Sequence, residues 1–167
     1  MEALKDARAW LTQHAGLRQT KTVTRKSSRG HTILFLGPPS SRTSKRTTAE
    51  MLGNEFGKEI YRVELSQVVG EYIGETEKNL AAVFKKAADN DSILFFDEAD
   101  ALFGRRTEVR DAHDRYANAE VSYLLQRLED HPGLVILAAN LKGTIDPAFT
   151  RRFQTVVKFP RVRSASK

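Results

Sequence analysis

The chain has 167 residues, 40% of them hydrophobic and none of them cysteine. This length fits one domain with its own core, and the lack of cysteine excludes disulfides, cysteine-ligated zinc and a thiol nucleophile. The net charge of +6 is uneven, because residues 1–48 hold ten Lys or Arg against two acidic residues. Since no apolar stretch approaches the roughly 20 residues that span a bilayer, and the N-terminus has no secretory core, we expect a cytoplasmic protein without a membrane segment.

Residues 1–30 predict a short helix and a linker. Leu4, Ala7 and Leu11 recur at helical spacing, which indicates an amphipathic helix over residues 3–14. The basic stretch 18–30 could bind nucleic acid or an acidic partner, but it contains no aromatic residues for base stacking, so we favour a solvated linker. We divide the chain into this segment, a core over residues 31–160 and a basic tail over residues 161–167.

From residue 31 the hydrophobic pattern alternates between strands and helices. Three of the strands are continuous apolar runs, which are typical of a parallel sheet covered by helices on both faces. The fold class is therefore α/β, a three-layer αβα sandwich with a five-stranded parallel sheet. The predicted strands are residues 31–37, 60–65, 92–98, 134–140 and 155–159, and the predicted helices are residues 47–56, 75–88, 117–129 and 147–152.

The chemistry-bearing residues follow the strands. In such sheets ligands bind at the carboxyl ends of the strands, where Gly37, Asp97 and Asn140 lie in this interpretation. After the apolar run ILFF, Asp97 could hold a hydrated Mg²⁺ and Glu98 could polarise a water that attacks a terminal phosphate. Asn140 could position that water through its amide. The alternatives are a buried strand that ends in a charged turn, and an ordinary turn asparagine.

Two arginines close the segment DPAFTRRF, residues 146–153. The planar guanidinium of Arg151 or Arg152 suits phosphate oxygens and could stabilise a transition state in a neighbouring subunit. The alternative is a pair of helix-terminal arginines that neutralise surface acids.

The order of these motifs, GPP after a strand, then FFDEAD, LAAN and DPAFTRRF, resembles the nucleotide-binding core of AAA+ ATPases over residues 32–160. The resemblance implies a P-loop NTPase fold, ATP and Mg²⁺ as cofactors, a homo-oligomeric ring such as a hexamer, and a polypeptide substrate. It implies catalytic roles for Glu98, Asn140, Arg151 and Arg152. It also implies a helical lid after the fifth strand, so we expect this chain, which stops at Lys167, to be a fragment or an altered protein.

The segment GEYIGETEKNL, residues 70–80, corresponds by the same resemblance to the first pore loop. Tyr72 and Ile73 would then grip an extended polypeptide, with Gly70 and Gly74 allowing the loop to flex. The alternative is that both side chains pack beneath the loop. Residues 104–116 would match a second pore loop or an ordinary solvated loop.

The phosphate loop departs from the family pattern. An intact loop reads GPPGTGKT, whose glycines let backbone N–H groups meet the phosphates, and whose hydroxyl binds Mg²⁺. Counting back from the following helix makes Lys45 the loop lysine, with a loop two residues longer and Arg46 in place of the hydroxyl. The alternative winds the extra residues into the helix and turns Lys45 away. The predicted nucleotide-binding residues are Gly37, Pro38, Pro39, Ser40, Ser41, Arg42, Thr43, Ser44, Lys45 and Arg46.

Three functional hypotheses follow. The leading one is an ATPase that remodels proteins as a ring, in which Asp97 holds Mg²⁺ and Tyr72, Ile73 and Gly74 contact the polypeptide. The competing one is a scaffold or interaction module that keeps the fold without hydrolysing ATP, because non-glycine residues forced to positive φ would strain the loop by about 1 to 2 kcal/mol. The third is a nucleic-acid-associated ATPase that uses the basic segment 18–30.

Overall fold

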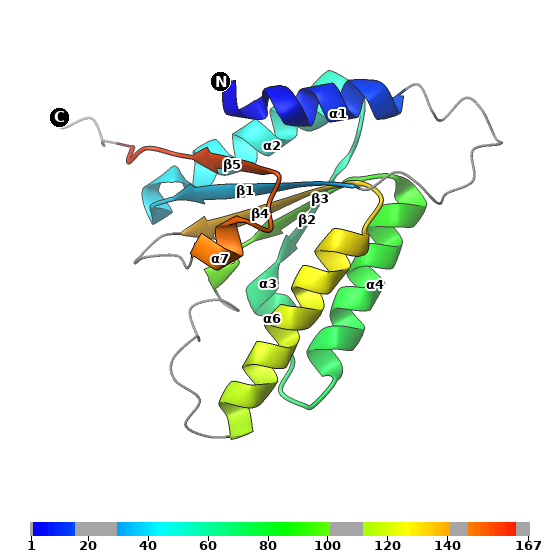
Figure 1. The fold of residues 1–167 in the computed structure, drawn as a ribbon, viewed down its shortest axis with the longest axis vertical. Coiled ribbons are helices and arrows are strands. Elements are labelled where there is room, and N and C mark those ends of the chain that lie inside the picture. The colour runs from blue at the N-terminus through cyan, green and yellow to red at the C-terminus, as the bar shows by residue number, and fades with distance from the viewer. Residues whose placement is uncertain (1, 16–29, 101–111, 141–146, 163–167) are drawn as a thin grey trace.

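The computed structural model describes residues 2–15, 30–100, 112–140 and 147–162, and these form a three-layer α/β sandwich (Figure 1). The elements in chain order are η1 (Glu2–Leu4), α1 (Lys5–Ala15), β1 (His31–Gly37), η3 (Pro39–Ser41), α2 (Arg42–Phe56), β2 (Ile60–Glu64), α3 (Leu65–Val68), α4 (Glu75–Asn90), β3 (Ile93–Asp97), α6 (Ala112–Asp130), β4 (Leu134–Asn140), α7 (Pro147–Thr150) and β5 (Thr155–Lys158).

The five strands form one parallel sheet in the order β2-β3-β4-β1-β5. The three central strands are almost wholly buried, because helices cover both of their faces. This explains their continuous apolar runs and confirms the predicted fold class. The carboxyl ends of β1 and β4 are in register, with Gly37 opposite Asn140.

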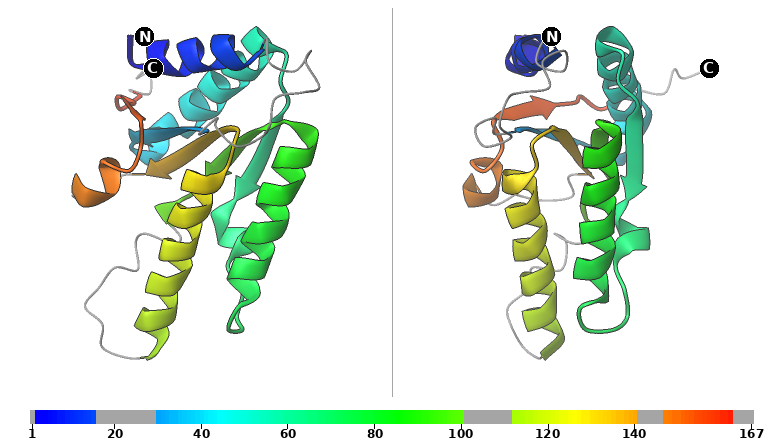
Figure 2. Two further views of the ribbon diagram at one scale, coloured as in Figure 1. Left: turned by 45° about the vertical axis from the view of Figure 1, so that its right-hand side comes forward. Right: turned by 90° about the vertical axis from the view of Figure 1, so that its right-hand side faces the viewer.

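Alternate residues of each central strand face opposite layers. Ile33 and Phe35 of β1 pack with α1 and α2, whereas Leu34 and Leu36 pack with α3, α4, α6 and α7. Figures 1 and 2 show α1 and α2 on one side of the sheet, and α4 and α6 extending away from the other. Leu4, Ala7 and Leu11 are fully or almost fully buried, so the N-terminal helix belongs to the core as its spacing indicated.

The predicted strands and the helices over residues 3–14, 75–88 and 117–129 are confirmed, with ends that differ by a few residues. The helix predicted over residues 47–56 begins five residues earlier, at Arg42. A one-turn helix, α3, was not predicted. The linker residues 18–29 lie outside the described residues, and so do residues 104–111. Of the predicted second pore loop, residues 104–116, only residues 112–116 are described, and they form the start of α6.

No helix within the described ranges is both long and apolar enough to cross a membrane.

His131 lies buried between α6 and β4, with its ring 5.5 Å from that of Phe84. Burial, helped by the positive charge of Arg127 and opposed by Asp91, lowers the pKa of His131 from 6.5 to about 4. The folded chain therefore keeps this imidazole neutral where the unfolded chain would protonate it, and stability is lost as pH falls below about 6.5.

We predict that the free energy of unfolding falls by about 2 kcal/mol more between pH 7 and pH 5 in the wild-type chain than in His131→Gln. Urea unfolding at both pH values measures this difference. Gln13→Ala, which alters an exposed residue of α1 that has no titratable group, is the control and should keep the wild-type pH dependence. Equal pH dependence in the wild-type chain and His131→Gln would contradict the prediction.

Candidate functional site

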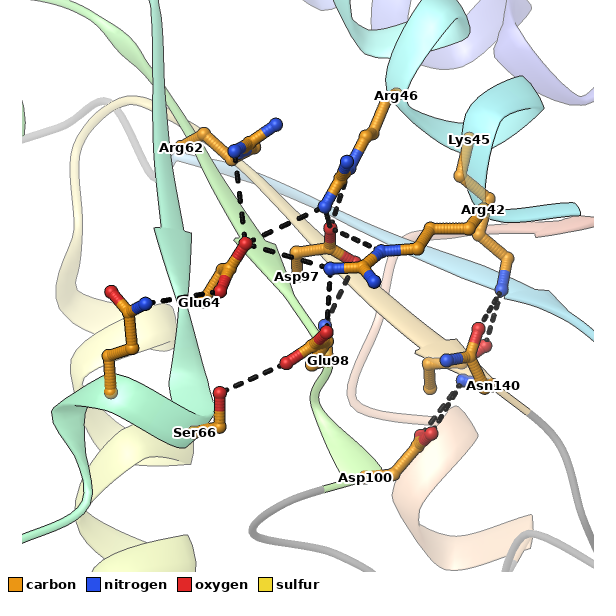
Figure 3. A network of polar contacts seen from close by, with 12 residues as sticks. Arg42, Lys45, Arg46, Arg62, Glu64, Ser66, Asp97, Glu98, Asp100 and Asn140 are labelled. Carbon is orange, nitrogen blue, oxygen red and sulfur yellow. Dashed lines mark hydrogen bonds and ion pairs between the residues drawn. The ribbon is translucent and has the colours of Figure 1, made fainter. Parts of the chain in front are cut away.

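The carboxyl ends of β1, β3 and β4 meet at one edge of the sheet, together with the start of α2. Gly37, Asp97 and Asn140, which the sequence placed at strand ends, are the last residues of these three strands. The candidate site is therefore this edge, and Figure 3 shows its polar contacts.

The segment after Gly37 is helical rather than an open loop. Pro38 links β1 directly to η3, and α2 follows at Arg42. The N–H of Ser41 donates to Pro38 O at 2.9 Å and the N–H of Arg42 donates to Pro39 O. The expectation of a longer loop was wrong, because the additional residues are wound into helical turns.

The expected strain is also absent from this segment. Pro38, Ser41 and Arg42 all have negative φ, and the residues with positive φ in the described chain lie elsewhere. Gly37 is packed closely, since a Cβ there would lie 2.6 Å from Ser41 Oγ and 2.9 Å from Phe159 O. The chain thus replaces a glycine-rich turn with helix, which L-residues adopt without strain.

Lys45 lies in the first turns of α2 and is 1% exposed. Its ammonium donates to Gly37 O and Ala139 O at 2.9 Å each and to Asn140 Oδ1 at 3.0 Å. These three bonds use all three protons of the ammonium and join the ends of β1 and β4. Burial lowers the pKa of Lys45, and the charges of Asp100 and then Asp97 oppose this shift.

Asn140 is held from both sides. Its backbone N–H donates to both carboxylate oxygens of Asp100 at 2.8 and 3.1 Å, while its side-chain oxygen accepts from Lys45. Burial raises the pKa of Asp100, and the hydrogen bond from Asn140 is the largest effect that opposes this. Asn140 is therefore fixed in orientation, with its Oδ1 engaged by a cation of this chain.

Asp97 is 3% exposed and its charge is paired with arginine. Arg46 donates from Nε and Nη2 to Asp97 Oδ2 at 2.8 and 2.7 Å, and Arg42 approaches the same oxygen at 3.4 Å. The other oxygen, Oδ1, accepts the N–H of Glu98 at 2.9 Å. Both oxygens of this carboxylate are thus hydrogen-bonded within the chain (Figure 3).

Glu98 is paired in the same way. Its Oε1 lies 2.6 Å from Nη2 of Arg42, and its Oε2 accepts from Ser66 Oγ at 3.0 Å. Its backbone has φ of 57°, in the left-handed region that a non-glycine residue rarely adopts. Such strain is of order 1 kcal/mol and is found at functional sites and switches. Both oxygens of Glu98 are thus engaged by this chain, and a water that is to be activated would have to displace or share one of these partners.

Glu64 at the end of β2 completes the network, with the guanidinium groups of Arg42, Arg46 and Arg62 at 3.6, 3.7 and 3.8 Å from its Oε1. Three arginines face three carboxylates, those of Glu64, Asp97 and Glu98, so their formal charges cancel. We call these six residues the arginine–carboxylate network. The sequence analysis did not identify Glu64, Arg62, Ser66 and Asp100 as site residues. Two of them carried a signal, because Glu64 ends β2 and Asp100 follows the end of β3 by three residues.

The residues present do not fit a Mg²⁺–nucleotide complex in this arrangement. The carboxylate that would hold the metal is bound to Arg46, and among the described residues no group of three or more His, Asp or Glu is placed to hold a metal ion. The ammonium of Lys45 and the N–H groups of Ser41 and Arg42 are also engaged by the chain itself. A triphosphate would therefore find these three donors already used.

The predicted pore loop lies at the end of α4 that points away from the sheet (Figure 1). Tyr72 is 75% exposed and Ile73 is 77% exposed, which excludes the alternative that they pack beneath the loop. Gly74, with φ of 80°, turns the chain into α4 in a conformation that favours glycine. The loop is anchored, because Gly70 N donates to Thr76 Oγ1 at 3.0 Å and Tyr72 N donates to Glu75 Oε2 at 3.2 Å.

Arg151 and Arg152 follow α7 and are both exposed. Arg152 lies 3.4 Å from Glu129 in a surface ion pair of the kind that contributes little to stability. Neither belongs to the arginine–carboxylate network, so their predicted roles toward a neighbouring subunit remain predictions.

The parallel five-stranded sheet, with acidic, amide and lysine groups at its carboxyl edge, is consistent with the class of α/β nucleotide-binding proteins, in which ligands bind at the carboxyl ends of the strands. The sequence profile of the family described as "ATPase family associated with various cellular activities (AAA)" matches residues 33–161. The chain belongs to this family, whose members generally bind ATP with Mg²⁺.

Named relatives agree with this membership. The chain is 36% identical over 134 residues to the "Uncharacterized AAA family ATPase y4kL" of Sinorhizobium fredii, covering 80% of this chain and 40% of that protein. It is 32% identical over 121 residues to the "Cell division cycle protein 48 homolog" of Archaeoglobus fulgidus, covering 71% and 16%. It is 37% identical over 122 residues to the "ATPase family gene 2 protein" of Schizosaccharomyces pombe, covering 71% and 15%. The chain thus spans less than half the length of these relatives.

The bonds of Lys45 give a direct prediction. Lys45→Met should lower the free energy of unfolding by about 2 to 4 kcal/mol, because three strand-end acceptors lose a buried donor. Urea unfolding without nucleotide measures this effect. Lys78→Met, which alters an exposed lysine of α4, is the control and should change stability by less than about 0.5 kcal/mol. If Lys45→Met were as stable as Lys78→Met, the hydrogen bonds of Lys45 to the strand ends would not stabilise the fold.

Proposed function

We propose that this chain is an AAA module that engages extended polypeptide through Tyr72 and Ile73, and that its own nucleotide site does not hydrolyse ATP. The observation that carries the first half is the exposure of these two side chains on an anchored loop. An aromatic and a β-branched side chain presented side by side at the tip can pack on apolar side chains of an unfolded chain without sequence preference. The resemblance to AAA+ proteins supports a ring in which several such loops act together.

The arginine–carboxylate network supports the second half. Hydrolysis needs a metal at Asp97 and a free base at Glu98, whereas Arg46 and Arg42 bind these two carboxylates at 2.7 and 2.6 Å. Opening both pairs would uncover a buried carboxylate, which is strongly unfavourable unless another cation replaces the guanidinium. The module then acts as a binding or scaffold unit.

A second candidate function is ATP hydrolysis coupled to protein remodelling, in which Asp97 holds Mg²⁺, Glu98 activates water, Asn140 positions it, and Arg151 or Arg152 acts on a neighbouring subunit. The meeting of Asp97, Glu98 and Asn140 at one edge of the sheet favours it. It requires Arg42 and Arg46 to leave their carboxylates when nucleotide arrives, and Lys45 to release both strand ends.

We predict that the double substitution Tyr72→Ala and Ile73→Ala weakens binding of a labelled, permanently unfolded casein at least tenfold, as measured by fluorescence anisotropy. Both side chains are exposed, so the melting temperature should stay close to that of the wild-type chain. Met51→Ala, which removes a hydrophobic side chain that is 49% exposed on α2, is the control and should bind like the wild type. Equal binding by the double variant and the control, or no measurable binding by the wild-type chain, would refute the role of this loop.

We also predict that the wild-type chain releases no phosphate above the protein-free rate at millimolar ATP and Mg²⁺. The Glu98→Gln variant serves as the control, and it should give the same background rate. Phosphate release by the wild-type chain that disappears in Glu98→Gln would reject the non-hydrolysing half of the proposal and favour the second candidate.

A further inference from the structure

We infer that Arg46 takes the place of a divalent cation at this site: its guanidinium holds Asp97 against α2, and the folded chain neither binds nor needs Mg²⁺ there. This inference extends the nucleotide-site half of the proposed function. Its test reads the response of stability to metal rather than turnover, so either claim can fail without the other.

The geometry of the pair is that of a strong, directional contact. Two nitrogens of Arg46 donate to one oxygen of Asp97 at 2.8 and 2.7 Å, and the second oxygen is already hydrogen-bonded to the backbone of Glu98. Charge-assisted hydrogen bonds of this kind are roughly twice as strong as neutral ones. Because Asp97 is 3% exposed, water cannot easily replace these partners if they are removed.

The electrostatic surroundings oppose a second cation. A divalent ion bound to Asp97 Oδ2 would lie near two guanidinium groups, since Arg42 Nε is 3.4 Å from the same oxygen. The network is formally neutral without metal, with three arginines and three carboxylates. Adding a charge of +2 within ion-pair distance of Arg42 and Arg46 is therefore repulsive, and no anionic side chain of the network is left unpaired to offset it.

The pair also joins separate layers of the fold. Arg46 lies in α2, Asp97 ends β3 and Glu64 ends β2, so one guanidinium contacts the ends of two strands from the helix above them. A metal ion at such an edge would link the same elements only while it is bound. Arginine makes the link permanent, and the position of α2 on the sheet is then independent of metal supply.

The test compares thermal unfolding in 5 mM MgCl₂ and in EDTA for the wild-type chain and for Arg46→Thr. The wild-type melting temperature should be the same in both buffers. Arg46→Thr uncovers Asp97 and supplies a hydroxyl, so in EDTA its melting temperature should fall by about 5 °C or more. Mg²⁺ should restore at least half of that loss. Arg8→Thr, which removes an ion pair with Glu55 at 2.9 Å far from the site, should show no response to Mg²⁺.

Two results would overturn the inference. One is a wild-type melting temperature that rises in Mg²⁺ and loses this response in Asp97→Asn. The other is a folded Arg46→Thr variant whose stability does not respond to Mg²⁺.

If Arg46→Thr does not fold, titration of the wild-type chain with Mn²⁺ followed by electron paramagnetic resonance decides the matter. The spectrum of free Mn²⁺ should be unchanged by the protein. Binding at sub-millimolar Mn²⁺ that Asp97→Asn abolishes would overturn the inference.

Discussion

The carboxylate of Asp97 is the constraint on which the carboxyl edge of this protein depends. It ends the central strand β3, is almost fully buried, and cannot keep its charge there without a cation or several donors. The chain supplies that cation itself through Arg46, with Arg42 shared between Asp97 and Glu98. The helical start of α2 is part of the same solution, because Arg42 and Arg46 are one turn apart on a helix and so reach the same carboxylates together.

The position of Lys45 and its hydrogen bonds follow from the early start of α2. An open glycine-rich loop would hold backbone amides and the lysine toward a phosphate. Here the lysine is instead buried against the strand ends and bonded to Gly37, Ala139 and Asn140. The residues of the site thus satisfy one another, and the chain keeps the AAA fold while its polar groups at the nucleotide edge are internally paired. Among the described residues, Tyr72 and Ile73 are the two most exposed large hydrophobic side chains, and both lie on the loop before α4.

The fold was largely predictable from the sequence, because continuous apolar runs such as those within residues 31–37 and 134–140 are typical of parallel strands that are buried on both faces. The positions of Asp97 and Asn140 followed from strand ends alone. The start of α2 could not be predicted in this way. The family pattern has glycines in this segment and predicts a loop, whereas this chain has Ser, Thr and Arg there, which adopt a helix without strain. The sequence showed that Arg46 stands where the family pattern has a hydroxyl residue. Its contact with Asp97 could not be predicted, because it depends on where α2 begins and therefore on the direction in which Arg46 points.

The most direct test of this account is a crystal structure of the chain grown with Mn²⁺ and ATP, with anomalous scattering recorded for manganese. We expect no anomalous peak beside Asp97, and we expect the guanidinium of Arg46 to lie within hydrogen-bond distance of the Asp97 carboxylate. A manganese ion bound to Asp97, with the side chain of Arg46 displaced and a triphosphate at the start of α2, would contradict it.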